Sequence, residues 1–156
     1  MEKIAIDWVA RAKALFDAPK PQHFTDFSHC EECAEHDQVL LAADIDSIGL
    51  DELGNPGWDP LCFTSAEGKK YYLPALVRLC LATMESEFYL AQFFFHLEGS
   101  GATNEFHASC NESQCRFIAD FIAYLMVNHS TEIEKNMCGD CAVQCHNIWD
   151  HQAIAV

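Results

Sequence analysis

Lysine and arginine are absent from residues 21–68, although eleven aspartates and glutamates lie in that segment. The whole chain carries a formal net charge of −15 at pH 7. A negative field of this size repels the phosphates of DNA and RNA, so direct binding of nucleic acid is not expected. The same field attracts a cation or a basic protein partner, and it also keeps a surface soluble without any specific partner.

Long apolar runs are also absent. The longest candidate, residues 71–97, is interrupted by Pro74, Arg78, Glu85 and Glu87, whereas a membrane span needs about 20 consecutive apolar residues. Charged residues near the start of the chain replace the apolar core of a signal peptide. We therefore expect a cytoplasmic protein without membrane contact, whose nine cysteines are reduced thiols or metal ligands rather than a disulfide framework.

Alternating patterns typical of strands are scarce, and apolar residues recur at helical spacing instead. The turn-forming residues 54–57 mark a loop, and the apolar run 76–97 is either one buried helix or two helices that meet near Ser86. We predict an all-α fold: a single compact helical domain, residues 1–156, of about five to seven helices. The predicted core includes Trp8, Leu15, Leu76, Leu79, Phe93, Phe117, Phe121, Leu125, Ile148 and Trp149.

Four side chains that bind soft metals lie in one octet, residues 29–36, which reads His-Cys-Glu-Glu-Cys-Ala-Glu-His. On a helix, His29, Cys33 and His36 occupy positions i, i+4 and i+7 and share one face, with Cys30 at its border. Zinc binds imidazole nitrogen and thiolate sulfur in tetrahedral geometry. The octet therefore predicts a zinc site with Cys30, Cys33 and His36 as ligands, and with His29 as a ligand or as a hydrogen-bonding neighbour of the ligands.

Four ligands on one short helix cannot converge on a tetrahedral ion without distortion, so a ligand from elsewhere in the chain is expected. Cys62 follows the turn at residues 56–60 and could fold back to the octet, and His23, Asp59 and Cys138 are alternatives. The competing interpretation is that the octet is a packed, acidic helix that holds no metal.

A second group of cysteines, Cys138, Cys141 and Cys145, has the spacing i, i+3 and i+7 and is followed by His146. Such spacing can serve zinc or an iron–sulfur cluster, and two of the thiols can form a redox pair. Apolar neighbours in the same stretch favour a simpler interpretation, in which the reduced cysteines pack as small hydrophobic residues.

Three separated motifs occur in order along the chain: His-Cys-Glu-Glu-Cys-Ala-Glu-His-Asp at 29–37, Leu-Gly-Asn-Pro-Gly-Trp-Asp-Pro at 53–60 and Tyr-Tyr-Leu-Pro-Ala-Leu at 71–76. Together they resemble a family of small, uncharacterised bacterial proteins, and the resemblance extends to residues 113–116 and 148–149. It implies a soluble bacterial helical protein with no assigned activity.

Catalytic motifs give little support for an enzyme. Glu32 or Glu35 could act as a general base beside a metal-bound water, or both are solvated acids on a helix surface. A Gly-rich phosphate loop and a Gly-x-Ser-x-Gly elbow are absent. Three hypotheses stay open: a zinc-stabilised protein that acts by binding a partner, such as a basic protein or a second copy of itself; a metal-dependent hydrolase centred on residues 29–36; and an acidic decoy of a nucleic-acid-binding surface.

Overall fold

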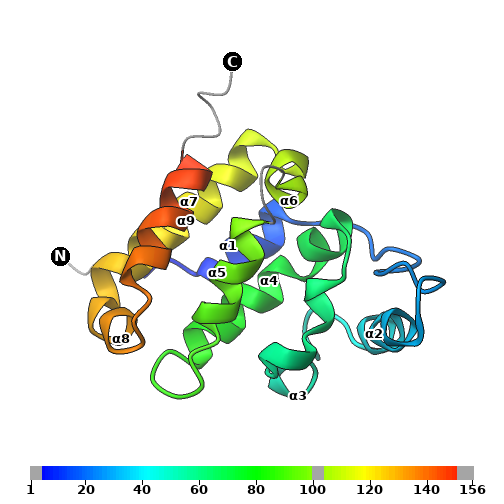
Figure 1. Cartoon of the computed structure of the whole chain (residues 1–156). Coiled ribbons are helices and arrows are strands. Elements are labelled where there is room, and N and C mark those ends of the chain that lie inside the picture. Colours follow the sequence, from blue (N-terminus) through cyan, green and yellow to red (C-terminus); the bar gives the residue numbers. More distant parts are fainter. Residues whose placement is uncertain (1–4, 100–103, 151–156) are drawn as a thin grey trace.

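The computed structural model describes residues 5–99 and 104–150, and within these ranges the chain forms helices and loops without strands (Figure 1). Six helices have eight or more residues, which agrees with the predicted five to seven and confirms the all-α class. They are α1 (Trp8–Leu15), α2 (Glu31–Ala42), α4 (Ala66–Ala82), α5 (Leu90–Glu98), α7 (Glu112–Asn128) and α9 (Gly139–Asp150). The shorter elements are α3 (Leu50–Leu53), α6 (Glu105–Ser109), α8 (Ser130–Lys135) and the 3₁₀ helices η1 (Pro56–Trp58) and η2 (Pro60–Cys62). None of the helices in the described ranges has both the length and the apolar character that crossing a membrane requires.

Helix α7 packs along α9 and against α1 (Figure 1). It begins with a capping box: the Asn111 side chain accepts from the backbone N–H of Gln114, and the Gln114 side chain accepts from the backbone N–H of Asn111. Further along the helix, Phe117 and Phe121 contact Trp8 of α1, with ring centroids 5.8 and 5.4 Å away. Burial of such large apolar rings is a main source of stability in a domain of this size.

The apolar run that follows the capping residue Ser65 forms two helices, α4 and α5, with Ser86 in the loop between them. This is one of the two arrangements that the sequence predicted. Helix α4 continues through Pro74 without ending there. The hydroxyl group of Tyr72, also in α4, donates to the carbonyl oxygens of Leu40 and Ala43 and so attaches the end of α2 to the core.

The predicted core residues belong to one continuous hydrophobic core. Leu15 and Ile148 are partly buried and pack against it, and the other predicted residues are buried within it. The buried residues are Trp8, Leu76, Leu79, Phe93, Phe117, Phe121, Leu125 and Trp149. Apolar stripes of helical spacing therefore identified the side chains that fill the core.

A buried carboxylate fastens the segment before α2 to that helix. Asp37, in α2, accepts hydrogen bonds from the backbone N–H groups of Phe24 and Thr25 at 2.6 and 3.2 Å, and its carboxylate contacts the His23 ring at 2.7 Å. Burial raises the pKa of Asp37, but the hydrogen bonds from these three residues outweigh burial and leave the pKa below its ordinary value. The segment that leads to the octet is thereby held against α2.

The C-terminal cysteines lie in or against the core. Cys145 is fully buried, Cys138 is nearly so, and Cys141 packs against the core from a half-buried position. The Sγ atom of Cys145 lies 3.5 Å from the carbonyl oxygen of Phe94. In the described part of the chain these cysteines do not form a group that could hold a metal ion, which agrees with the packing interpretation.

Replacing Cys145 by alanine is expected to lower the free energy of unfolding by about 1 kcal/mol, because a small cavity replaces the sulfur in a closely packed core. We expect the metal content to stay unchanged. Urea unfolding and elemental analysis measure the two quantities, with the half-buried Cys141→Ala as a control of smaller effect. Loss of bound metal in the Cys145→Ala variant would contradict the packing interpretation.

Candidate metal centre

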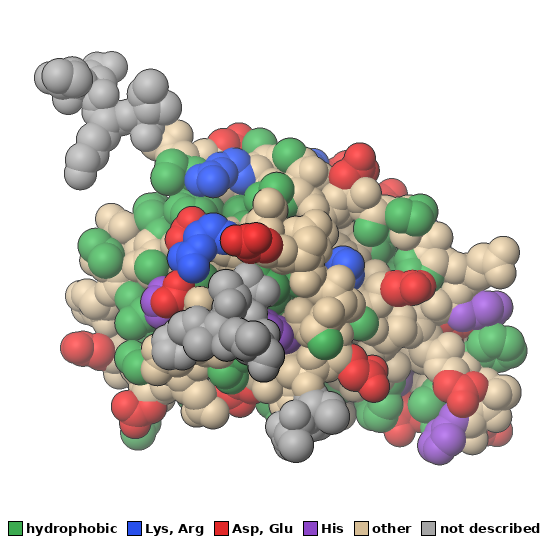
Figure 2. Space-filling view, turned by 90° about the horizontal axis from the view of Figure 1, so that it is seen from above, with side chains coloured by type: hydrophobic (Ala, Val, Ile, Leu, Met, Phe, Trp, Pro, Cys, Tyr) green, Lys and Arg blue, Asp and Glu red, His purple; other side chains and the backbone are tan. Residues whose placement is uncertain are grey.

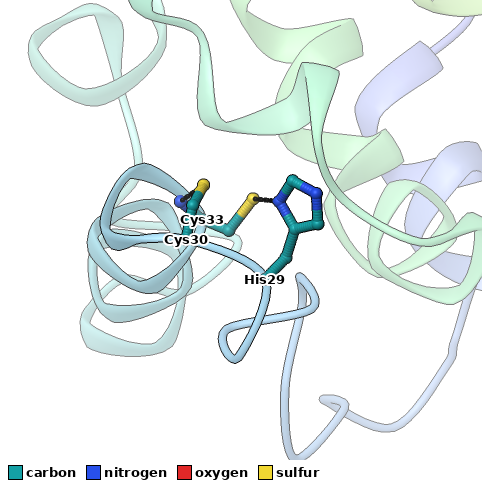
Figure 3. Close-up of side chains that lie close together, drawn as sticks. All are labelled: His29, Cys30 and Cys33. Atoms are coloured by element: carbon teal, nitrogen blue, oxygen red, sulfur yellow. Dashed lines mark hydrogen bonds between the residues drawn. The ribbon is translucent and has the colours of Figure 1, made fainter.

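Three of the four predicted octet ligands meet at the N-terminus of α2, and we call His29, Cys30 and Cys33 the octet site (Figure 3). Cys30 is the N-cap of α2, and its Sγ accepts a hydrogen bond from the backbone N–H of Cys33 at 3.4 Å. The Nδ1 atom of His29, in the preceding loop, lies 3.7 Å from Cys33 Sγ. One ligand atom from each residue lies within 4.8 Å of the other two. Ligand atoms of a tetrahedral zinc site are roughly 3.3–3.8 Å apart, so small side-chain rotations would let all three bind one ion.

The electrostatics of the octet site favour a negative charge on the Cys30 sulfur. The pKa of the Cys30 thiol is lowered, first by the backbone N–H of Cys33 and then by a hydrogen bond with His29. The pKa of His29 is raised, chiefly by its hydrogen bond with Cys30. The pKa of Cys33 is raised by a hydrogen bond with the Cys30 sulfur, by partial burial and by the charge of nearby acids. A metal ion would displace the protons that remain on these groups.

His36 lies apart from the octet site. Helix α2 begins after Cys30, so His29 is not on the helical face that the sequence predicted. The His36 ring is fully buried and packs against the rings of Trp58 and Phe63, whose centroids are 4.7 and 5.0 Å away. The structure thus uses His36 in an aromatic contact between α2 and the loop that carries η1 and η2.

Cys62 also lies apart from the octet site and joins Asp59 and His96, which together we call the cavity site. One ligand atom from each of these residues lies within 4.8 Å of the other two. The Asp59 Oδ2 atom accepts hydrogen bonds from His96 Nε2 at 2.8 Å and from the Gln92 amide at 3.0 Å, and Oδ1 accepts from the backbone N–H of Leu61. Asp59 and His96 are almost completely buried, with 3% and 2% of their surface exposed.

The residues considered as a distant ligand for the octet all have other surroundings. His23 contacts the carboxylate that fastens the preceding segment to α2, and Cys138 lies in the core. Asp59 and Cys62 belong to the cavity site. The fourth position of a metal at the octet site is therefore left to water, to a side chain of a partner or to Asp26, whose charge already acts on the octet residues.

A cavity of about 330 Å³ adjoins the cavity site. Its wall includes Cys62, Lys69, His96, Asn104 and Glu105. Cys62 is exposed as a residue, but partial shielding of its thiol from water, together with the charge of Asp59, raises the pKa of the thiol to about 11. Burial also lowers the pKa of Lys69 from its ordinary value. The cavity therefore brings together the Cys62 thiol, the His96 imidazole and the Lys69 amine, at a place where the protein partly shields charge from water.

His96 has no sequence spacing that marks it as a ligand. It lies far along the chain from Cys62, inside the apolar helix α5. A single histidine in an apolar run was the only signal, and such a residue is usually a hydrogen-bonded core residue. Its proximity to Asp59 and Cys62 follows from the packing of the loop against α5, which spacing alone does not reveal.

Comparisons of the chain with models of known protein families, with curated proteins and with solved structures find no match. The resemblance to a family of small bacterial proteins therefore stays a prediction. Any functional proposal rests on the geometry and electrostatics of the two sites.

Proposed function

We propose that this protein binds Zn²⁺ through His29, Cys30 and Cys33, and that this end of the molecule contacts a basic protein partner. The observation that supports zinc most directly is the convergence of one imidazole nitrogen and two sulfur atoms within 4.8 Å. Zinc prefers this mixture of ligands, whereas Mg²⁺ and Ca²⁺ prefer oxygen. The hydrolase and decoy hypotheses stay predictions. The hydrolase hypothesis places its centre at residues 29–36, whereas the cavity of about 330 Å³ lies beside Cys62.

The surface around the octet site supports a basic partner. Three aromatic side chains at this end are about half exposed: Phe27 by 49%, Trp58 by 43% and Phe63 by 45%. Exposed aromatic rings are enriched at protein interfaces. In Figure 2 the right-hand end of the molecule, where α2 lies in Figure 1, shows acidic and histidine side chains and no basic ones on the visible face. A partner rich in lysine and arginine would meet complementary charge there.

Zinc content of the purified, untagged protein tests the metal proposal. The Cys33→Ser variant is expected to hold one zinc equivalent fewer per chain than the wild type, because it lacks one thiolate ligand. Cys141→Ser is the matched control, since Cys141 is half-buried and outside both candidate sites. His36→Phe keeps an aromatic ring in the contact with Trp58 and Phe63 and is expected to keep its zinc. Equal zinc content in wild type and Cys33→Ser would contradict the proposal.

Charge reversal on α2 tests the partner. Glu31 and Glu35 are exposed on this helix, so Glu31→Lys/Glu35→Lys changes the surface charge without changing the core. Cross-linking of wild type and variant in cell extract, followed by mass spectrometry, should identify a basic protein that only the wild type captures. Identical sets of cross-linked proteins would contradict the charge argument.

Thiol–disulfide exchange at the same two cysteines is a second candidate function. The observation that favours it is the pair of opposite pKa shifts: the pKa of the exposed Cys30 is lowered, and that of Cys33 is raised. In Cys-x-x-Cys pairs at helix N-termini, the first thiolate attacks a disulfide and the second thiol resolves the mixed disulfide. With oxidised glutathione, the pair would give up two electrons and two protons and form one internal disulfide, and two molecules of glutathione thiol would be released.

Incubation of zinc-free protein with oxidised glutathione distinguishes the two functions. The redox function predicts rapid loss of two hydrogen atoms in the wild type and a stable glutathione adduct at Cys30 in Cys33→Ser, both seen by mass spectrometry. A reaction at Cys30 that is no faster than the reaction at Cys141 would contradict the redox function.

A further inference from the structure

The cavity site is assembled from two segments that the fold holds firmly in place. Asp59 is the N-cap of the 3₁₀ helix η2, Cys62 is its last residue, and His96 comes from α5. Their oxygen, sulfur and nitrogen atoms lie within 4.8 Å of one another. Ligand atoms around tetrahedral zinc are roughly 3.3–3.8 Å apart, so shifts of about an ångström bring these atoms to coordinating positions.

Hydrogen bonds already orient the ligand atoms of this site. The His96 Nε2 atom and the Asp59 Oδ2 atom form a hydrogen bond at a separation of 2.8 Å, and a metal ion that binds both atoms takes the place of this hydrogen bond. The Gln92 amide donates to the same carboxylate and can keep its hydrogen bond when a metal is present. Outer hydrogen bonds of this kind orient metal ligands in many zinc proteins. Among the described residues no hydrogen bond joins Cys62 to His96, so the pair is not arranged as a nucleophile and its base.

We propose that Asp59, Cys62 and His96 form a second metal site, which binds Zn²⁺ or another divalent transition metal at the wall of the cavity and leaves one coordination position open to a small oxyanion held by Lys69. Among the described residues the site has three protein ligands, the number typical of zinc sites that keep a position for water or substrate. The proposal does not depend on zinc binding at the octet site, since the two sites share no residue.

Charge balance in the cavity favours an anionic ligand. Once a metal binds, the Asp59 carboxylate and the Cys62 thiolate together neutralise a divalent ion. Lys69 then adds a positive charge in the partly shielded cavity, and its ammonium group makes no ion pair within the described part of the chain. Glu105 also lines the cavity but is exposed, so water screens its charge. A cavity of about 330 Å³ accommodates a small carboxylate or phosphate compound.

Cobalt(II) titration of the Cys30→Ser/Cys33→Ser protein tests metal binding in the absence of the octet site. One equivalent of Co²⁺ is expected to produce thiolate-to-cobalt charge-transfer absorption together with visible bands of a low-coordinate ion. Further replacement of Cys62 by serine should abolish the charge-transfer absorption, and His96→Gln should weaken binding at least about tenfold. Cys62 is exposed, so the serine variant is expected to fold, which circular dichroism checks. Absence of the charge-transfer absorption in the Cys30→Ser/Cys33→Ser protein would overturn the proposal without affecting the octet site.

Acetate tests the open coordination position. Addition of acetate to the cobalt-loaded protein is expected to change the visible bands, because the carboxylate replaces water on the metal. In Lys69→Gln the acetate concentration for half of this change should rise roughly fivefold, as expected for loss of one partly shielded ion pair. Lys70→Gln is the matched control, since Lys70 donates to the carbonyl oxygen of Ser109 and does not line the cavity. Bands that do not respond to acetate would overturn the open position, and equal responses in the two variants would overturn the role of Lys69.

Discussion

The affinity of the octet site for Zn²⁺ is expected to fall by about two to four orders of magnitude between pH 7 and pH 5. Zinc binds the deprotonated forms of His29, Cys30 and Cys33, so protons compete with the metal. The pKa of Cys33 is raised, and this thiol therefore stays protonated in the zinc-free protein throughout the range. Its displaced proton alone lowers the affinity about tenfold for each pH unit. His29, whose pKa is also raised, and Cys30, whose pKa is lowered, add to this slope where they are protonated.

Competition with a chromophoric zinc chelator at several pH values measures this slope. The Cys62→Ser variant is the protein to use, since the cavity site then contributes no thiolate and the octet site is the one candidate site that keeps its thiol ligands. An affinity that changes by less than about tenfold over the two pH units would show that carboxylates, which are already deprotonated in this range, bind the ion instead of the thiols. Cys33→Ser, made in the same Cys62→Ser protein, provides the matched background of weaker binding, because only His29 and Cys30 of the octet site remain.

Local periodicity predicted the helices and the core because both depend on residues close in sequence. The stripe that contains Phe117, Phe121 and Leu125 lies on one face of α7 and is buried as expected. Turn chemistry was equally local: the turn signal at 54–57 leads into the 3₁₀ helix η1, and a break near Ser86 was one of the two arrangements that the sequence left open. Such features follow from backbone geometry and burial, and they do not require knowledge of which helices meet.

Residue spacing located the octet site but did not determine which of its side chains converge. Two interactions decided that outcome, one local and one between segments far apart in the chain. Cys30 caps α2 with its sulfur, so the helix begins one residue later and His29 stays in the loop. His36 packs against Trp58 and Phe63, which come from a loop whose position spacing does not specify. A four-residue ligand set on one helix face therefore became a three-residue set at a helix terminus.

The cavity site was beyond prediction for a different reason. Asp59 and Cys62 were considered only as additional ligands for the octet, because the octet was the nearest group of soft ligands in the sequence. His96 reaches them only because α5 packs beside the 3₁₀ turn, a contact between segments far apart in the chain. No periodic pattern encodes such a contact, and the buried hydrogen bond between Asp59 and His96 is what reveals it.

Replacement of Asp59 by alanine is expected to lower the free energy of unfolding by about 3–5 kcal/mol, because it removes one partner from a buried pair. The carboxylate accepts hydrogen bonds from His96, from Gln92 and from the backbone N–H of Leu61. Without it, the buried imidazole of His96 loses its acceptor, and the half-buried Gln92 amide keeps only its hydrogen bond to the carbonyl oxygen of Leu53. In addition, η2 loses the side chain that caps it. Urea unfolding in the presence of a chelator measures this loss without a contribution from bound metal.

Two further variants make the Asp59 measurement decisive. Asp59→Asn keeps one oxygen acceptor, and its free energy of unfolding is expected to be about 1–3 kcal/mol below that of the wild type. A domain of this kind has a stability of about 5–15 kcal/mol, so Asp59→Asn is the variant to measure if Asp59→Ala does not fold. Asp51→Ala removes an exposed carboxylate from α3 and should change the stability by less than about 1 kcal/mol. A loss below about 1 kcal/mol in Asp59→Ala would mean that the carboxylate is not buried and paired in solution. The contact between η2 and α5 that assembles the cavity site would then lack its main polar support.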